Sequence, residues 1–84
     1  MKMIHNSFVL RNDRPETLTL NIEPEGAFFP LSAGEEVSVT DSFTSVPATL
    51  RLTNSKVGEL IVSIWPGDGE VTARHHGVDV LELQ

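Results

Sequence analysis

Cysteine is absent from this 84-residue chain. Without a thiol the protein can form no disulfide, no thiolate metal site and no cysteine nucleophile, and a cupredoxin-like copper site is excluded. The absence fits a reducing compartment without requiring one. Redox chemistry is therefore not expected of this protein.

Basic residues are scarce, because six lysines and arginines stand against twelve aspartates and glutamates, which gives a net charge of −6. Residues 15–41 contain six acidic residues and no base. A nucleic-acid backbone and an anionic membrane surface both need a basic patch on the protein that binds them. We therefore expect neither nucleic acid nor membrane among the partners.

Long apolar runs are also missing. The longest uninterrupted stretch extends from Ala27 to Leu31 and includes Pro30. Polar residues occupy positions 5–7, where a signal peptide would need its apolar segment. No membrane span and no export signal is expected, so the predicted localisation is cytoplasmic.

Strand-forming residues, by contrast, are plentiful. Valine, isoleucine and threonine fill twenty positions, with eleven glycines and prolines spread among them. Residues 17–23 alternate strictly, with Leu18, Leu20 and Ile22 on one face, whereas no window has the spacing of a capped amphipathic helix. A chain this short has enough apolar residues for one core, so we predict a single domain over residues 1–84.

The predicted fold class is all-β, a small antiparallel β-sandwich, jelly-roll-like, with about eight short strands. The strands are expected at residues 7–11, 17–23, 27–30, 36–41, 48–53, 59–65, 70–75 and 78–83. Alternation within them predicts an inward-facing set consisting of Leu18, Leu20, Ile22, Val37, Val39, Leu50, Leu52, Leu60, Val62, Ile64, Val71, Ala73 and Val80.

Two turn signals order the last third of the chain. Residues 66–69, Pro-Gly-Asp-Gly, are typical of a four-residue hairpin loop, which would pair the strands on either side of it. A two-residue turn at positions 76–77 would then set Arg74 opposite Asp79 and continue the last strand to residue 83. The expected result is a three-stranded meander with one apolar face turned inward.

The outward face of this meander is the candidate binding surface. The predicted register places on it four large apolar side chains beside the charged pair of Arg74 and Asp79. The candidate binding residues are Ile61, Trp65, Arg74, Leu81 and Leu83. Such a patch is covered either by the N-terminal segment of the same chain or by a partner.

The run from Asn12 to Glu35 contains Pro15, the alternating residues 17–20 and two turn segments, residues 23–26 (Glu-Pro-Glu-Gly) and residues 31–35 (Leu-Ser-Ala-Gly-Glu). The last third of the chain contains two more turn segments, residues 65–67 (Trp-Pro-Gly) and residues 76–77 (His-Gly). Together they resemble a group of short uncharacterised bacterial proteins with Glu-Pro-x-Gly and Trp-Pro-Gly turns. The chain departs from the group at Glu25, where the group has tryptophan, and at His76, where it has aspartate. The resemblance implies a bacterial origin and a single all-β domain, and it supplies no function.

The adjacent histidines His75 and His76 raise the question of a metal site. Neighbouring residues on a strand point to opposite faces and cannot both ligate one ion without distortion, and a site would also need His5 or a carboxylate nearby. We expect His76 in a turn and His75 at a strand end near the rim of the core, with no metal and no cofactor. A metal-assisted enzyme built on His75 is the weakest alternative.

No catalytic motif is present. Seven serines occur without a nucleophile elbow, and the acidic residues near Asp68 match no EF-hand spacing. We therefore expect a non-enzymatic interaction or structural module whose partner is another protein or a second copy in a homodimer. The alternative is a small-molecule or carbohydrate-binding sandwich in which Trp65 is a stacking platform and Arg74, Glu70 and Asp79 are polar contacts.

Overall fold

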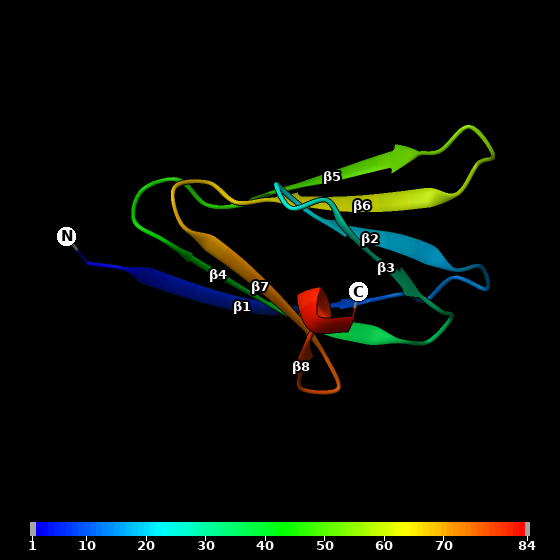
Figure 1. The fold of residues 1–84 in the computed structure, drawn as a ribbon, viewed down its shortest axis with the longest axis horizontal. Helices are drawn as coiled ribbons and strands as arrows, with labels where there is room; N and C mark the ends of the chain where they lie inside the picture. The colour runs from blue at the N-terminus through cyan, green and yellow to red at the C-terminus, as the bar shows by residue number, and fades with distance from the viewer. Residues whose placement is uncertain (1, 84) are drawn as a thin grey trace.

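The computed structural model describes residues 2–83, which form eight strands and one short 3-10 helix (Figure 1). The elements are β1 (Ile4–Arg11), β2 (Leu18–Ile22), β3 (Ala27–Leu31), β4 (Glu36–Phe43), β5 (Thr49–Asn54), β6 (Leu60–Trp65), β7 (Glu70–His75), β8 (Val78–Asp79) and the helix η1 (Val80–Leu83). Sheet A has the strand order β1-β4-β7-β8 and sheet B the order β3-β2-β6-β5. The predicted all-β, sandwich-like class is confirmed. One pairing departs from the antiparallel arrangement, because β2 and β6 run parallel.

The core lies between the sheets and consists of the inward-facing rows of β2, β3, β4, β6 and β7, together with Val80 of η1. Leu20 lies beside Val62 in sheet B, Val39 lies beside Ala73 in sheet A, and all four side chains are buried. Among residues 2–83 the buried apolar side chains are Leu18, Leu20, Ile22, Ala27, Leu31, Val37, Val39, Phe43, Val62, Ile64, Ala73 and Val80. Leu60 and Val71, also predicted as core, are partly buried against this cluster.

Two leucines predicted to be core are exposed. Leu50 and Leu52 keep 43% and 69% of their surface accessible, although they lie beside the buried residues Ile64 and Val62 and so share their inward face. The reason is that β5 is an edge strand of sheet B, and sheet A does not cover it. The prediction was wrong because alternation identifies the face of a strand but not whether another layer lies over it.

The two sheets meet closely along one side of the sandwich. The rings of Phe29 in β3 and His75 in β7 lie 5.0 Å apart, and β3 also contacts η1. The β3 edge of sheet B therefore lies over the β7–β8 side of sheet A. The remaining two edge strands are β1 of sheet A and β5 of sheet B.

The predicted hairpin between β6 and β7 is wrong. In the structure β6 pairs with β2 and β5, whereas β7 pairs with β4 and β8, so residues 66–69 cross from sheet B to sheet A (Figure 1). Strands on opposite sheets of a sandwich each turn one apolar face inward, so they show the same alternation of apolar and polar residues as two strands of a hairpin. The predicted register was consistent with the faces but placed the strands in one sheet.

A carboxylate holds this crossing loop in place. The carboxylate of Asp68 accepts hydrogen bonds from the backbone N–H groups of Thr44 (2.9 Å), Ser45 (2.8 Å) and Val46 (3.0 Å), and from the Thr44 hydroxyl (2.8 Å). These bonds, that from the Thr44 N–H above all, lower the pKa of Asp68 to about 2. The β6–β7 loop is thereby fastened to the β4–β5 loop.

The two glycines of the β6–β7 loop lie where there is no room for a side chain. A Cβ at Gly67 would lie 1.9 Å from the carbonyl oxygen of Val46, and one at Gly69 would lie 1.6 Å from that of Ser42. No side chain fits at either distance, so the backbone packs directly on backbone here. The Pro-Gly-Asp-Gly sequence therefore encodes a close crossing between layers.

The C-terminal turn is as predicted as far as Asp79. His75 lies opposite Val78, and Arg74 lies opposite Asp79. The predicted continuation to residue 83 is wrong, because the Asp79 carboxylate accepts the backbone N–H of Leu81 at 3.0 Å and starts η1 there. Val80, fully buried in η1, still belongs to the core as predicted. Within residues 2–83 no helix is long and apolar enough to cross a membrane.

A buried asparagine joins the other corner of the sandwich. Asn12, 1% exposed, follows β1 and donates from Nδ2 to the carbonyl oxygens of Glu16 (2.8 Å) and Leu31 (2.9 Å). Its Oδ1 accepts the backbone N–H of Arg14 at 3.0 Å. One side chain thus ties the β1–β2 connection to the end of β3.

Candidate functional site

The residues predicted to form one binding surface lie in three places. Ile61 and Trp65 are on the outer face of sheet B, because they alternate with the buried residues of β6. Arg74 is on the outer face of sheet A, next to Ser38 of β4. Leu81 and Leu83 are exposed on η1. The structure keeps Ile61 with Trp65 and separates both from Arg74, because β6 and β7 belong to different sheets.

The N-terminal segment does not cover Trp65. It forms β1 and pairs with β4 in sheet A. Trp65 is 40% exposed, and together with Thr49 and Arg51 of the neighbouring β5 it lines a shallow hollow of about 300 Å³. The polar neighbours of the tryptophan are therefore these two residues rather than the predicted Arg74, Glu70 and Asp79.

The most exposed apolar feature of sheet A is its edge strand, β1. This strand has eight residues, all paired on one side with β4, and its other side is free within residues 2–83. Its inward row includes Ile4 and Phe8, which remain 45% and 37% exposed because sheet B does not cover this edge. Val9 on the outward row is 56% exposed.

The three other sheet edges differ from β1. The β3 edge contains Pro30, which has no backbone N–H to donate, and β8 is two residues long and runs directly into η1. The β5 edge has six residues and carries Arg51 at its middle. Native proteins commonly protect edges with proline, charge or short length. Only β1 among these four is long and without such protection.

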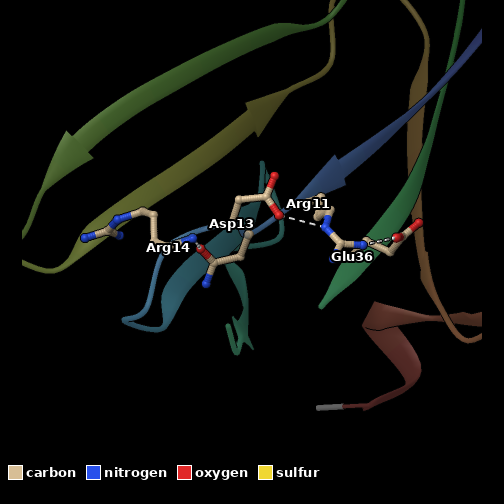
Figure 2. A network of polar contacts seen from close by, with 5 residues as sticks. Arg11, Asp13, Arg14 and Glu36 are labelled. Carbon is tan, nitrogen blue, oxygen red and sulfur yellow. Dashed lines mark hydrogen bonds and ion pairs between the residues drawn. The ribbon is translucent and has the colours of Figure 1, made fainter. Parts of the chain in front are cut away.

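The one permanently charged residue of β1 is already paired. Arg11 at its end contacts Asp13 (Nε to Oδ1, 2.7 Å) and Glu36 (Nη1 to Oε1, 3.1 Å), as Figure 2 shows, while Arg14 extends away from them. Asp13 first, and then Glu36, raise the pKa of Arg11. The arginine therefore does not present an uncompensated charge at the free edge.

A second cluster lies at the far end of sheet A, around the C-terminal turn. Glu35, His75 and His76 each offer one ligand atom, and these atoms all lie within 4.8 Å of one another. The Nε2 atom of His75 is 3.1 Å from Oε2 of Glu35, and the two imidazole rings are 4.1 Å apart, edge to face. A hollow of about 470 Å³ opens here, lined also by Gly34 and Gly77.

The expectation that the two histidines diverge is wrong. His76 has a φ of 51° and forms the turn together with Gly77, whose φ is 79°, so the alternation of a strand ends at His75. The turn folds the His76 ring back onto that of its neighbour. Sequence reasoning placed both residues correctly, at the strand end and in the turn, but missed the consequence of the left-handed backbone.

Sequence reasoning also missed the β1 edge and the part played by Glu35. The lack of proline and lysine between Ile4 and Arg11 was a usable signal for an unprotected edge. The approach of Glu35 to His75, forty residues further along the chain, has no local signature.

Comparison with protein-family models, with curated proteins and with solved structures finds no match. The resemblance to short bacterial all-β proteins therefore remains an expectation from the sequence. Any functional assignment has to come from the geometry described above.

Proposed function

We propose that the protein is a non-enzymatic interaction module that binds a second copy of itself through the free edge of β1. The observation that carries this proposal is the edge itself, eight regular residues paired on one side, with Ile4 and Phe8 of the inward row 45% and 37% exposed. Such a strand is a template for a further strand, since the N–H and C=O groups on the side away from β4 lack sheet partners. Adding the same strand from a second copy would join the two A sheets into one.

The sequence of β1 is compatible with pairing to itself. In an antiparallel pair centred on Ser7, Ile4 of one copy lies opposite Leu10 of the other, and Asn6 lies opposite Phe8. The inward rows then remain on one face. On the outward row His5 meets Val9, so no two charges of like sign face each other. Pairing thus covers apolar surface without an electrostatic penalty along the strand.

Self-association is tested by light scattering coupled to gel filtration over a wide concentration range. The expected mass rises from 9.2 kDa toward twice that value. In the wild-type protein, amide exchange should slow with concentration at alternate residues of β1, because every second N–H points to the free edge. A monomer at all concentrations, or protection confined to another edge, overturns the proposal.

Variants locate the interface. Ile4→Lys combined with Phe8→Lys places charge on the inward row of β1, and Val9→Lys does so on its outward row, where 56% exposure leaves the fold intact. All of these should remain monomeric. The matched control is Leu52→Lys on β5, which is exposed on the other open edge and lies outside the β1 pairing, so it should retain strand pairing at β1. Dimerisation that survives both β1 variants contradicts the assignment.

A second candidate function rests on Trp65. Its ring and the guanidinium of Arg51 border the 300 Å³ hollow on sheet B, the arrangement in which a sugar ring stacks and hydrogen-bonds. Because Trp65 is the single tryptophan of the chain, a panel of oligosaccharides can be screened by intrinsic fluorescence. Quenching or a blue shift that saturates, and that Arg51→Ala abolishes, supports this alternative. An unchanged spectrum across the panel removes it.

A further inference from the structure

We propose that Glu35, His75 and His76 form a binding site for one divalent transition-metal ion of the zinc type. The three residues come from the β3–β4 connection, the end of β7 and the turn after it, and their ligand atoms lie within 4.8 Å of one another. This inference is independent of the β1 edge. It assigns a ligand to the hollow of about 470 Å³ at the β7–β8 end of sheet A.

The distances suit an ion of this size. Zinc binds histidine nitrogen and carboxylate oxygen at about 2.0–2.2 Å, so neighbouring ligands of a tetrahedral site lie about 3.3 Å apart. Nε2 of His75 and Oε2 of Glu35 are already separated by 3.1 Å. An ion between these two atoms requires almost no movement of either residue. The third ligand has to approach by less than the width of one atom.

Two of the ligands are held in position by contacts outside the site. Oε1 of Glu35 accepts the backbone N–H of Ser32 at 2.9 Å, which leaves Oε2 directed to His75. The ring of His75 packs against Phe29 and is 15% exposed. Outer contacts of this kind orient ligands in metal sites.

The third ligand, His76, is an uncommon residue at the first position of such a turn. His76 is the one residue other than glycine with positive φ among residues 2–83. A two-residue turn with positive φ at both positions favours asparagine followed by glycine. Histidine in the first position is less suited to the backbone, but it brings an imidazole to the side of His75. Its side chain therefore supplies at this position a nitrogen ligand that asparagine would not provide.

The donor set selects the class of ion. Two imidazole nitrogens and one carboxylate oxygen suit zinc and its neighbours in the first transition row, whereas magnesium and calcium prefer oxygen ligands throughout. Three protein ligands also leave at least one coordination position toward the hollow. Glu36, which lines the same hollow, is held by Arg11 at 3.1 Å and so is engaged elsewhere.

The test is calorimetric titration of zinc chloride into protein purified without a histidine tag and stripped with a chelator. One ion per chain is expected, and saturating zinc should raise the melting temperature, since the ion binds the folded state. Imidazole nitrogen spectra should shift at His75 and His76 and remain unchanged at His5. Absence of heat and of any thermal shift overturns the proposal.

Substitutions then assign the ligands. Glu35→Gln retains the size and the bond to Ser32 but loses the charge, and His76→Asn supplies the residue that the turn prefers. Each should weaken zinc binding about tenfold or more while the protein stays folded in the absence of zinc. The control is His5→Asn, which removes a histidine that is bonded to Ser42 on the far half of sheet A and should bind like wild type. Affinity unchanged in both site variants, or lost in the control, contradicts the assignment.

Discussion

Two leucines that look equivalent in the sequence pattern test the arrangement of the sheets when each is replaced by alanine. Leu20 and Leu52 both belong to the inward rows of sheet B, and both follow the same alternating pattern in the sequence. In the structure Leu20 has no exposed surface, whereas Leu52 is 69% exposed. The expected cost of replacing each by alanine therefore differs severalfold.

The magnitudes follow from burial. Leucine to alanine removes three carbon atoms, worth about 2.4 kcal/mol of transfer free energy when fully buried. At Leu20 the cavity left behind adds to this, for a total of about 3–4 kcal/mol. At Leu52 about a third of the transfer term applies and no closed cavity forms, so the expected loss stays below about 1 kcal/mol. The total stability of a domain of this size is about 4–13 kcal/mol.

The assay is urea unfolding of dilute protein followed by Trp65 fluorescence and circular dichroism. Leu20→Ala should lower the midpoint strongly and the melting temperature by about 12 °C or more, whereas Leu52→Ala should shift the latter by a few degrees. Equal losses for the two variants would refute the reasoning. They would mean that β5 is covered by another layer in the monomer.

The remaining predictions concern single contacts. Asn12→Ala leaves two carbonyl groups and one N–H without their partner and should cost about 2–3 kcal/mol in urea unfolding. Gly69→Ala forces a methyl group against the backbone of Ser42 and should cost at least about 2 kcal/mol, read from the thermal midpoint. The depressed pKa of Asp68 means that its stabilising contribution is present above its ordinary value of 3.8 and is lost as pH falls toward about 2. The free energy of unfolding of the wild type should therefore drop across that interval more steeply than that of Asp68→Asn. A separate variant, His76→Asn, should melt at the wild-type temperature or higher in the absence of metal, because asparagine suits the turn.

Much of the fold could be predicted from local pattern. The strict alternation around Leu20 and around Val39 identified both faces of their strands, since a sheet packed on one side needs apolar residues at every second position. The turn at His76 and Gly77 and the pairing of Arg74 with Asp79 were also predictable, because a two-residue turn sets the register of the strands that it joins.

The candidate sites were less accessible. The predicted surface combined Trp65 with Arg74 because the loop between their strands was interpreted as a hairpin, and a tight loop crossing between layers has a similar glycine-rich sequence. The histidine cluster depends on Glu35, which lies in another connection of the chain. Contacts between residues that far apart in sequence are decided by sheet order, which no local pattern encodes.

The amino-acid sequence by itself determined that the chain is a β-rich domain, where most strands begin and end, and which side of each strand is apolar. These properties depend on neighbouring residues, through backbone preference and the two-residue period. Only the tertiary structure decided which strands are neighbours, which inward faces are covered and which are left open. That choice depends on the packing of whole layers: the buried Leu20 lies on an inner strand of sheet B, whereas the exposed Leu52 lies on an edge strand that sheet A does not cover.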